Sequence, residues 1–406
     1  MRPVNFSMST SGLRILWVND LASYYGGCER YVAGTAERLR AGGHESVLLY
    51  DVNRTTDAAF LRCFDEAFGM VSIKEQLASL KPDLIYLHQL RDLDLVRQIQ
   101  DHADCPILQF LHDHRYFCLR EHKITTLGKE VCRKTASAAN CYPCLGFVNK
   151  SERWPGITLK RIGQLESERR QISESDGFVV GSHYMQGHVA EHDIPVDQIH
   201  RIPLYSDATP APAGSADKTD TFVFVGNYLA GKGIDVLLDG FAKAKTNARL
   251  CIIGGKGDDQ PYRDQASQLG ITNRVDFESG LARDEVLRRL RDGLATVIPS
   301  RNPETFGLVA VESISQRTPV IGTDAGATGE WIEDGINGYR FPTDDSDALA
   351  KCLERIAADP DKAATMGDQS YQLYQQRFTP EAHLDALVQL FRDTIESTPE
   401  RRTAHA

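Results

Sequence analysis

The stretch "ATVIPSRNPETFGLVAVESISQRTPVIGTD", residues 295–324, contains one full period of an α/β pattern. A β-rich run at 295–300 leads into a polar turn, a helical pattern begins at about Phe306, and a second β-rich run occupies 318–324. Short apolar runs bounded by turn residues predict buried strands, and a helix between two of them predicts a parallel pair with a crossover connection. This stretch therefore predicts a doubly wound α/β sheet.

The alternation continues on both sides of this stretch. Further strands are predicted at 13–18, 46–51, 83–88, 106–112, 177–182, 221–226, 249–255 and 274–280. The stretch "TPAPAGSADKTD", residues 209–220, interrupts the pattern and has nothing to bury, so it indicates an interdomain linker or a surface loop. Two runs of this kind predict two Rossmann-like domains that face a central cleft, with ligands beyond the carboxyl ends of the strands.

The predicted domain boundaries follow from this pattern. We expect a loose tail at 1–11, a first domain at 12–206, a second domain at 207–377 and a C-terminal helix at 378–397. The C-terminal helix either caps a domain or crosses back onto the first one, because no strand follows it. An irregular insert is expected at about 115–170, inside the first domain.

Composition excludes several classes of protein. The chain has 406 residues, of which 41% are hydrophobic and 25% charged, which is typical of a soluble globular protein. A net charge of −10 argues against a nucleic-acid binder, since phosphate backbones select for clustered Lys and Arg. The sequence has no long apolar run of the kind that spans a membrane, and its first residues lack the apolar centre of a secretory signal. We therefore expect a cytoplasmic protein whose nine cysteines are reduced.

Two glycine-containing loops are candidates for phosphate binding. Gly26-Gly27 lie between the first predicted strand and a helix, and Lys232-Gly233 occupy the corresponding place in the second half of the chain. Glycine lets the backbone approach an anion, and a helix N-terminus offers unpaired N–H groups. Either loop alone is equally well a tight turn, but one in each half favours a diphosphate. A third glycine-rich turn at 251–260 does not fit the dinucleotide fingerprint, which disfavours a nicotinamide-linked enzyme.

Two glutamates, Glu304 and Glu312, lie eight positions apart around a Phe-Gly-Leu step. Glu304 is expected at or just before a helix N-terminus and Glu312 about two turns further on, on nearly the same face of that helix. Two carboxylates in this place suit hydrogen bonds to sugar hydroxyls, one at a transferred sugar and one at a ribose. The simpler interpretations are a helix cap for Glu304 and a solvated charge for Glu312. The second is weak, because apolar residues surround Glu312 and a charge among them needs a partner.

At these motifs the chain resembles the retaining glycosyltransferases of glycosyltransferase family 4, the group 1 glycosyl transferases, which have the GT-B fold. The motifs that carry the resemblance are "GGCER" at 26–30, "LRAGGHE" at 39–45, "FLHD" at 110–113, "VGNYLAGKGIDVLLDGF" at 225–241, "IPSRNPETFGLVAVESISQRTPVIGTDAG" at 298–326 and "EWIEDGINGYRFPTDD" at 330–345. The resemblance covers most of residues 13–397, and the pair of glutamates with "FGL" between them is its most specific part.

The resemblance implies roles for particular residues. Glu304 would contact hydroxyls of the donor sugar, Glu312 would hold the donor ribose, and Lys232 would neutralise the diphosphate. His112 would contact the transferred sugar or organise the reacting centre, so His112, Glu304 and Lys232 are the expected catalytic residues. The other expected donor contacts are Gly26, Gly27, Gly226, Asn227, Gly254, Leu281, Arg301, Thr305, Phe306, Gly307 and Leu308. His88 and Asp113 are candidates for acceptor binding.

The chain departs from the family pattern at Asn227, where many members have an arginine that helps the lysine hold the diphosphate. Because asparagine carries no charge, Lys232 would carry more of the leaving group's charge unless another cation such as Arg301 assists. This departure puts the details of diphosphate binding in doubt and leaves the predicted fold unchanged.

No catalytic metal is expected. The sequence "DLD" at 92–94 resembles the metal-binding motif of the other major glycosyltransferase fold, but it falls at a predicted helix start, where aspartate is a good cap. In the GT-B mechanism that the resemblance implies, backbone dipoles and the lysine support the leaving diphosphate.

The insert at 115–170 raises two further alternatives. It contains Cys118, Cys132, Cys141 and Cys144, which are either ligands of a structural Zn²⁺ ion or simply reduced thiols, or they form disulfides after purification. It also has 12 Lys or Arg against 5 Asp or Glu, and it contains Trp154. A basic, aromatic surface suits an anionic acceptor or a membrane surface, and a solvated charged helix explains it equally well.

These observations predict a metal-independent, retaining glycosyltransferase that moves a sugar from a UDP- or GDP-sugar to a hydroxyl of a glycan, a lipid-linked sugar or a small molecule. Such an enzyme would serve glycan, polysaccharide or glycolipid biosynthesis, and it would need no cofactor for catalysis. The alternatives are a sugar-nucleotide 2-epimerase of the same fold and a catalytically silent sugar-nucleotide-binding subunit. We expect a cytoplasmic location, with peripheral contact at the inner face of the membrane as an open alternative.

Overall fold

A computed structural model describes residues 12–126, 130–150, 156–212 and 218–398. The predicted tail at 1–11 and Trp154 lie outside the described residues. The chain forms two compact units, one made of residues 1–112, 170–179 and 384–406 and the other of residues 113–169 and 180–383. The cleft predicted between two domains stays a prediction.

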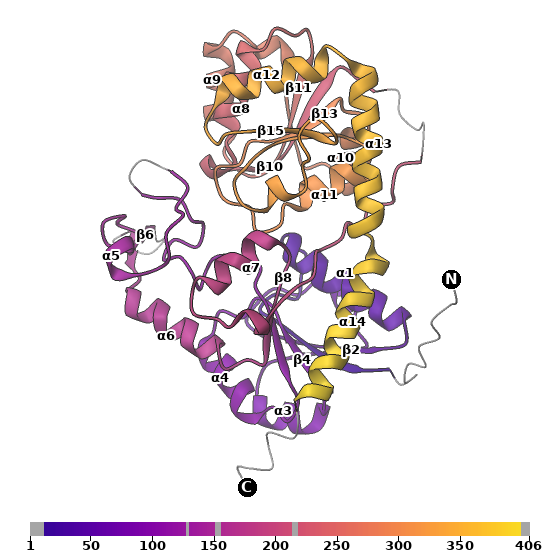
Figure 1. The fold of residues 1–406 in the computed structure, drawn as a ribbon. Helices are drawn as coiled ribbons and strands as arrows, with labels where there is room; N and C mark the ends of the chain where they lie inside the picture. The colour runs from indigo at the N-terminus through magenta and orange to yellow at the C-terminus, as the bar shows by residue number, and fades with distance from the viewer. Residues whose placement is uncertain (1–11, 127–129, 151–155, 213–217, 399–406) are drawn as a thin grey trace. The chain divides into compact units, whose positions relative to one another are not determined.

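The first large sheet has the strand order β3-β2-β1-β4-β5-β8-β9. Figure 1 labels its strands β2, β4 and β8. Its strands and the helices between them are β1 (Arg14–Asn19), α1 (Gly27–Ala41), β2 (Glu45–Tyr50), α2 (Ala58–Leu61), β3 (Glu66–Gly69), α3 (Ile73–Leu80), β4 (Leu84–Leu87), α4 (Leu93–His102), β5 (Ile107–Phe110), α6 (Ile162–Ile172), β8 (Gly177–Val180), α7 (His183–Ala190) and β9 (Ile199–Arg201). β1 pairs in parallel with both β2 and β4, so the direction of winding reverses between β1 and β4. Ligands of doubly wound proteins bind at such a reversal.

The second large sheet has the order β12-β11-β10-β13-β14-β15 and is parallel throughout its described pairings. Its elements are β10 (Thr221–Tyr228), η2 (Ala230–Lys232), α8 (Ile234–Lys243), β11 (Arg249–Gly257), α9 (Gln260–Gln268), β12 (Val275–Ser279), α10 (Arg283–Asp292), β13 (Ala295–Ile298), α11 (Leu308–Ser315), β14 (Val320–Thr323), η4 (Ala327–Glu330), β15 (Gly338–Phe341), α12 (Ser346–Ala357) and α13 (Pro360–Arg377). Here the reversal lies between β10 and β13. Residues just after these two strands are therefore placed where a ligand is expected.

Buried apolar side chains of the strands explain why these segments fold as sheets covered by helices. In the first sheet Leu16 and Val18 of β1 pack with Ile85 and Leu87 of β4 in one cluster. In the second, Phe222 and Phe224 of β10 join a larger cluster that includes the buried face of α8. Burial on both faces is typical of parallel strands, and it made the continuous apolar runs visible in the sequence.

The ten predicted strands are all present, and the α/β class is confirmed. The sequence prediction missed three short strands of the large sheets, β3, β9 and β15, because their three or four residues carry little periodic signal. It also missed a small antiparallel pair in the insert, β6 (Val148–Lys150) with β7 (Ile157–Leu159).

The C-terminal helix α14 (Pro380–Ser397) returns to the first unit from Leu384 onward. Its Phe391 ring lies edge-on against Tyr86 of β4, with the ring centroids 5.1 Å apart. α14 is drawn in yellow in Figure 1. Within the described part of the chain, no helix combines the length and the apolar character that a membrane span requires.

Candidate functional site

In the first unit, the candidate residues follow the strands at the reversal point. Gly26 is the N-cap of α1, with no side-chain cap hydrogen bond. A Cβ atom at Gly26 would lie 3.5 Å from the nearest other side chain, which is ordinary contact, so the protein itself does not demand glycine there. The predicted approach of an anion to Gly26 and Gly27 is the remaining reason for a glycine pair, and it stays a prediction.

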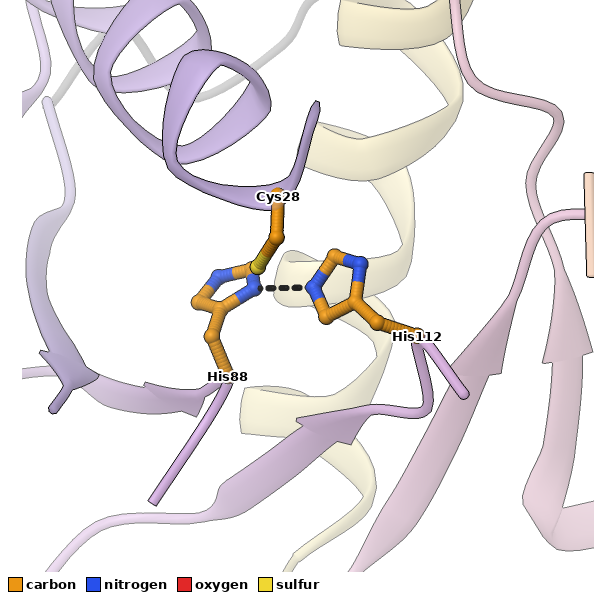
Figure 2. Close-up of side chains that lie close together, drawn as sticks. All are labelled: Cys28, His88 and His112. Carbon is orange, nitrogen blue, oxygen red and sulfur yellow. Dashed lines mark hydrogen bonds between the residues drawn. The ribbon is translucent and has the colours of Figure 1, made fainter. Parts of the chain in front are cut away.

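His88 and His112 form a hydrogen-bonded pair in this unit. His88 follows β4 and His112 follows β5, and Nδ1 of His88 lies 2.9 Å from Nε2 of His112 (Figure 2). The His88 ring is buried and stacks on Trp17, with the ring centroids 5.3 Å apart and the planes within 8°. Burial, together with the neighbouring His112, holds the pKa of His88 well below its usual range, so His88 stays neutral.

The tautomer of this pair follows from the hydrogen bonds of His88. Its Nε2 atom is buried and has no hydrogen-bond partner in the described structure. An unpaired buried N–H is rarer than an unpaired acceptor, so we assign the proton of His88 to Nδ1, which then donates to Nε2 of His112. This assignment places the proton of His112 on Nδ1, where it is a donor.

Cys28, the third residue of Figure 2, brings its thiol close to both rings from the start of α1. The donor atoms of Cys28, His88 and His112 lie within 4.8 Å of one another, a spacing that could hold a metal ion. The 2.9 Å distance between the two ring nitrogens is nevertheless a hydrogen-bond length. Two nitrogen ligands of one tetrahedral Zn²⁺ ion would lie about 3.3 Å apart. We therefore interpret the trio as a hydrogen-bonded pair with a neighbouring thiol.

Asp113, predicted to bind an acceptor, holds Arg115 in a two-pronged ion pair. Nη2 of Arg115 donates to Oδ2 of Asp113 at 2.7 Å, and Nε reaches Oδ1 at 3.0 Å. The Arg115 side chain is 9% exposed, so much of the Asp113 carboxylate's hydrogen-bonding capacity is directed to a buried guanidinium. This contact gives Asp113 a structural role, and acceptor binding by it stays a prediction.

The centre of the second unit's candidate site is an ion pair between Lys232 and Glu304. Nζ of Lys232 lies 2.6 Å from Oε1 of Glu304, and the hydroxyl of Ser300 donates to the same oxygen at 2.8 Å. Burial raises the pKa of Glu304, but the charge and hydrogen bond of Lys232, the hydrogen bond from Ser300 and the nearby His114 together lower it overall. Glu304 is therefore a carboxylate at neutral pH, as a role in accepting hydrogen bonds from hydroxyls requires.

Glu304 lies just before a helix, as predicted, but its position relative to Glu312 differs from the prediction. α11 begins at Leu308, so Glu304 is not on the helix, and Glu312 is little more than one turn inside it. The expectation that both carboxylates share a helix face two turns apart is wrong, because the chain first forms an isolated parallel bridge between Glu304 and Gly326. A Cβ atom on Gly326 would lie 2.4 Å from the carbonyl oxygen of Glu304, so only glycine permits this approach.

Glu312 has the partner that its apolar surroundings demanded. Nη1 of Arg283, at the start of α10, lies 2.9 Å from its Oε1, and the same guanidinium also pairs with Asp207. Arg283 was missed by sequence reasoning, because 29 positions separate it from Glu312 and it lies in no recognised motif.

The segment between the two glutamates forms the N-terminal end of α11. Gly307 is the N-cap and gives no side-chain hydrogen bond, so no side chain caps the first helical N–H groups. Phe306 is buried, and its carbonyl accepts a hydrogen bond of 2.6 Å from the indole of Trp331. The segment between the two glutamates therefore keeps four predicted donor-binding residues together at the start of α11. These are Thr305, Phe306, Gly307 and Leu308.

The remaining predicted donor residues lie at or near the ends of β10, β11 and β12. Oδ1 of Asn227 accepts a hydrogen bond of 2.9 Å from the backbone N–H of Lys256, which ties the end of β10 to the end of β11. The ring of Tyr228 covers Gly254, where a Cβ atom would lie 1.8 Å from the ring. Gly226 lies within β10, and Leu281 packs at the edge of a cluster around Leu290.

Arg301, the alternative cation for the diphosphate, already forms ion pairs with two aspartates. Its guanidinium donates to both oxygens of Asp235, at 2.6 and 2.7 Å, and it also pairs with Asp344. Arg301 would have to exchange these partners to meet a phosphate, whereas Lys232 has a single ion-pair partner among the described residues. The structure thus favours Lys232 over Arg301 as the cation of the site.

Asp92 is a helix cap. Its side chain accepts hydrogen bonds from the backbone N–H groups of Asp94 and Leu95 at the start of α4. These bonds use the carboxylate as the cap that the sequence pattern predicted.

The four cysteines of the insert come together. Cys118, Cys132, Cys141 and Cys144 are free thiols, and all four line one cavity of about 30 Å³. Burial raises the pKa of the Cys141 thiol, and negative charge on the other three raises it further. The sequence showed the residues but not their convergence, because 23 positions separate Cys118 from Cys141.

Part of the chain, mostly in the second unit, is similar to known glycosyltransferases. Residues 206–373 match the family model described as "Glycosyl transferases group 1". The O-antigen chain mannosyltransferase C of Escherichia coli is 29% identical over 181 residues, which cover 43% of this chain and 47% of that protein. The D-inositol 3-phosphate glycosyltransferase of Thermobifida fusca (strain YX) is 29% identical over 194 residues, covering 45% of this chain and 44% of that protein. The matches to these curated relatives span about half of their length.

Solved structures share the fold over nearly the whole chain. HepE of Anabaena, solved in complex with UDP, has a TM-score of 0.69 at 17% identity and covers 94% of this chain and 100% of that one. The sucrose-phosphate synthase of Thermosynechococcus elongatus has a TM-score of 0.70 at 19% identity and covers 95% of this chain and 99% of that one. Together with the two parallel sheets, these matches confirm the predicted GT-B fold.

Proposed function

We propose that this chain is a metal-independent, retaining glycosyltransferase that moves a sugar from a UDP- or GDP-sugar to an acceptor hydroxyl. The observation that carries the proposal is the Lys232–Glu304 ion pair at the reversal point of the second sheet. It lies inside the segment that matches the group 1 glycosyl transferase model. Relatives named as glycosyltransferases, and a structural neighbour solved with UDP, support the choice of substrate class.

In this proposal the ion pair divides when the donor binds. The Lys232 ammonium moves its contact from Glu304 to the diphosphate, where it stabilises the charge that grows on the leaving group. Glu304, kept ionised, then accepts hydrogen bonds from hydroxyls of the transferred sugar. The uncapped N–H groups at the start of α11 add fixed dipoles for the phosphates.

The acceptor oxygen attacks the anomeric carbon on the face from which the diphosphate leaves. The bond from that carbon to the phosphate oxygen breaks, and the departing phosphate takes the acceptor's proton. Retention then needs no covalent bond between the sugar and a carboxylate of the chain. His112, with its proton on Nδ1, would donate to the transferred sugar, and His88 keeps His112 in that tautomer.

Glu312 would hold the donor ribose. Arg283 holds its carboxylate in place, and the ribose hydroxyls would donate hydrogen bonds to it. The acceptor would be a glycan, a lipid-linked sugar or a small molecule in the cytoplasm, with or without peripheral contact to the inner membrane face. Such an enzyme would work in glycan, polysaccharide or glycolipid biosynthesis.

A two-stage experiment tests the proposal. A thermal-shift screen with UDP, GDP and ADP and their sugars finds the donor, since a ligand at 100 times its Kd stabilises the fold by about 2.7 kcal/mol. The donor is then incubated with and without a panel of acceptors, with Lys232→Ala as the inactive control. We expect acceptor-dependent nucleotide release and a product with the anomeric configuration of the donor by NMR. An epimerised donor in the absence of acceptor, or a donor bound and never consumed, would replace this proposal with an epimerase or a silent binding subunit.

A further inference from the structure

The cysteine-containing part of the insert, residues 118–146, has little regular secondary structure and a small apolar core among its described residues. Its regular structure is one short helix, α5 (Ala138–Cys141), and an isolated bridge between Ile124 and Val131. Its apolar cluster has four buried members, two of which lie outside it on α6. So small a core rarely stabilises a fold without a disulfide or a metal ion.

The chain brings the four thiols to one place by two separate turns. The backbone N–H of Cys132 donates to the carbonyl of Lys123 at 2.7 Å, which folds 118–132 back on itself. The Cys141–Cys144 turn begins at the last residue of α5, and the backbone N–H of Gly146 donates to the carbonyl of Cys141 at 3.2 Å. All four residues consequently line the same cavity of about 30 Å³, room for a single small occupant.

A second observation indicates that the cysteines around this cavity carry negative charge, as thiolates do. Lys123 lines the cavity and is 2% exposed, and its Nζ donates to the carbonyl of Lys134 at 2.6 Å. The ion pairs of the described residues do not include Lys123. A buried ammonium without a counter-charge is costly, and Arg120 adds a second cation beside the same cavity.

We propose that Cys118, Cys132, Cys141 and Cys144 bind one structural Zn²⁺ ion. Four thiolates and Zn²⁺ form a closed tetrahedral site with a net charge of about −2, which Lys123 and Arg120 would balance. The ion would bind without an open position, so it stabilises the insert and takes no part in sugar transfer. This inference does not depend on the proposed function.

The sulfur atoms must move closer when the ion binds. Among the described residues, the donor atoms of Cys28, His88 and His112 are the group of three that lie within 4.8 Å of one another, so the four thiols are spread more widely. Around Zn²⁺ the sulfurs would be about 3.8 Å apart. The two histidines of that trio already hydrogen-bond to each other, whereas the four cysteines have the ligand type that a structural zinc site requires.

Metal analysis of the purified full chain tests the proposal. The protein is expressed with Zn²⁺, passed over a chelating resin and examined by elemental mass spectrometry. We expect about one zinc per chain in the natural sequence and in the matched control Cys28→Ser, and at least a tenfold lower zinc content in Cys141→Ser and Cys144→Ser. Iron in place of zinc, no metal at all, or zinc lost only from Cys28→Ser would overturn the proposal.

A second measurement covers the case in which the cysteine variants fail to fold. The natural chain is refolded with Co²⁺ in place of Zn²⁺, and its absorption spectrum is recorded. Intense thiolate-to-cobalt charge transfer with tetrahedral ligand-field bands is expected, and both should vanish when Zn²⁺ is added. A spectrum of octahedral Co²⁺ without thiolate bands would contradict the site without the use of any variant.

Discussion

At the scale of single residues, Lys232 and Glu304 of the second unit depend on each other. Each is the other's ion-pair partner at 2.6 Å, and their side chains are 28% and 19% exposed. Removing one partner of a largely buried pair leaves the other charge uncompensated, whereas removing both relieves it. Substitutions in this pair are therefore expected to change both the free energy of unfolding and the turnover of the proposed enzyme.

We predict that Lys232→Met lowers the free energy of unfolding by about 2 kcal/mol and that adding Glu304→Gln restores part of the loss. Chemical denaturation of both single variants and the double variant checks this coupling. With the true donor, both single variants should lose about 10²-fold in turnover, because each acts on charge that develops in the transition state. Additive stability effects in the double variant would show that the two side chains do not interact in solution.

Glu312 should behave differently from Glu304. Glu312→Gln is expected to raise the donor KM about tenfold with little change in kcat, because the ribose changes little during reaction and its contact is uniform binding. Steady-state kinetics on Glu312→Gln and Glu304→Gln, side by side, separate the two roles. Loss of turnover in Glu312→Gln with unchanged donor affinity would move the second glutamate into the reacting centre.

At the scale of elements, the junction of β10, η2 and α8 positions Lys232. Gly233 is the N-cap of α8 with φ +69°, and a Cβ atom there would lie 2.0 Å from the carbonyl oxygen of Pro299. Gly270 has the same φ of +69° but open space around its Cβ position. An alanine would adopt the same unfavourable φ at both positions, but its Cβ atom would clash with a neighbour only at Gly233. The two positions therefore allow a controlled comparison.

Gly233→Ala should destabilise the chain clearly more than Gly270→Ala. Both substitutions cost about 1 kcal/mol for a left-handed alanine. Only the first also pushes the Lys232 loop away from β13 and should weaken binding of the nucleotide found in the thermal-shift screen. Melting temperatures and nucleotide titrations of the two variants check this. Equal losses in both variants would mean that the loop yields to the added methyl group.

Over the whole molecule, several buried histidines make stability depend on pH. Burial lowers the pKa of His383 to about 4, against a weaker opposing effect of its 2.7 Å hydrogen bond to the carbonyl of Pro203. Burial likewise lowers the pKa values of His114 and His192 to about 4. As pH falls, the unfolded chain binds protons near pH 6.5, before the folded chain does, so stability falls between about pH 6.5 and pH 4.

We expect the melting temperature to drop steeply over that range, with up to about 3 kcal/mol lost for one such histidine. His383→Asn keeps a donor for Pro203 but cannot titrate, so its melting temperature should fall less between about pH 7 and pH 4.5. Thermal melts of the natural chain and this variant across the range provide the comparison. If the melting temperatures of both proteins fell equally with pH, His383 would not contribute to the pH dependence.

Removal of metal ions distinguishes a catalytic metal from a structural one. Brief treatment with EDTA should leave transfer activity intact, because Lys232 and backbone N–H groups meet the charge of the leaving diphosphate. Immediate loss that Mg²⁺ or Mn²⁺ restores would contradict the proposed mechanism. Slow loss that only Zn²⁺ restores is expected if EDTA removes a structural ion from the four cysteines.

The two α/β runs, the ten predicted strands and the loops that contain Lys232 and Glu304 could all be predicted from the amino-acid sequence alone. These features depend on local properties, since a buried parallel strand is a short apolar run and a strand-to-helix turn needs glycine or proline nearby. The resemblance then suggested roles for residues within those loops. Short strands such as β3 and β15 were not predicted, because four residues show too little periodicity in hydrophobicity.

The contacts between side chains that are distant in the sequence became known from the three-dimensional structure. Lys232 and Glu304 are 72 positions apart, and Arg283 and Glu312 belong to different helices, so no local pattern pairs them. The start of α11 at Leu308 was likewise decided by the bridge between Glu304 and Gly326. The four insert cysteines converge for the same reason. Their contacts depend on how sheets, helices and turns pack against one another, and that free energy comes from long-range burial that single-residue propensities do not contain.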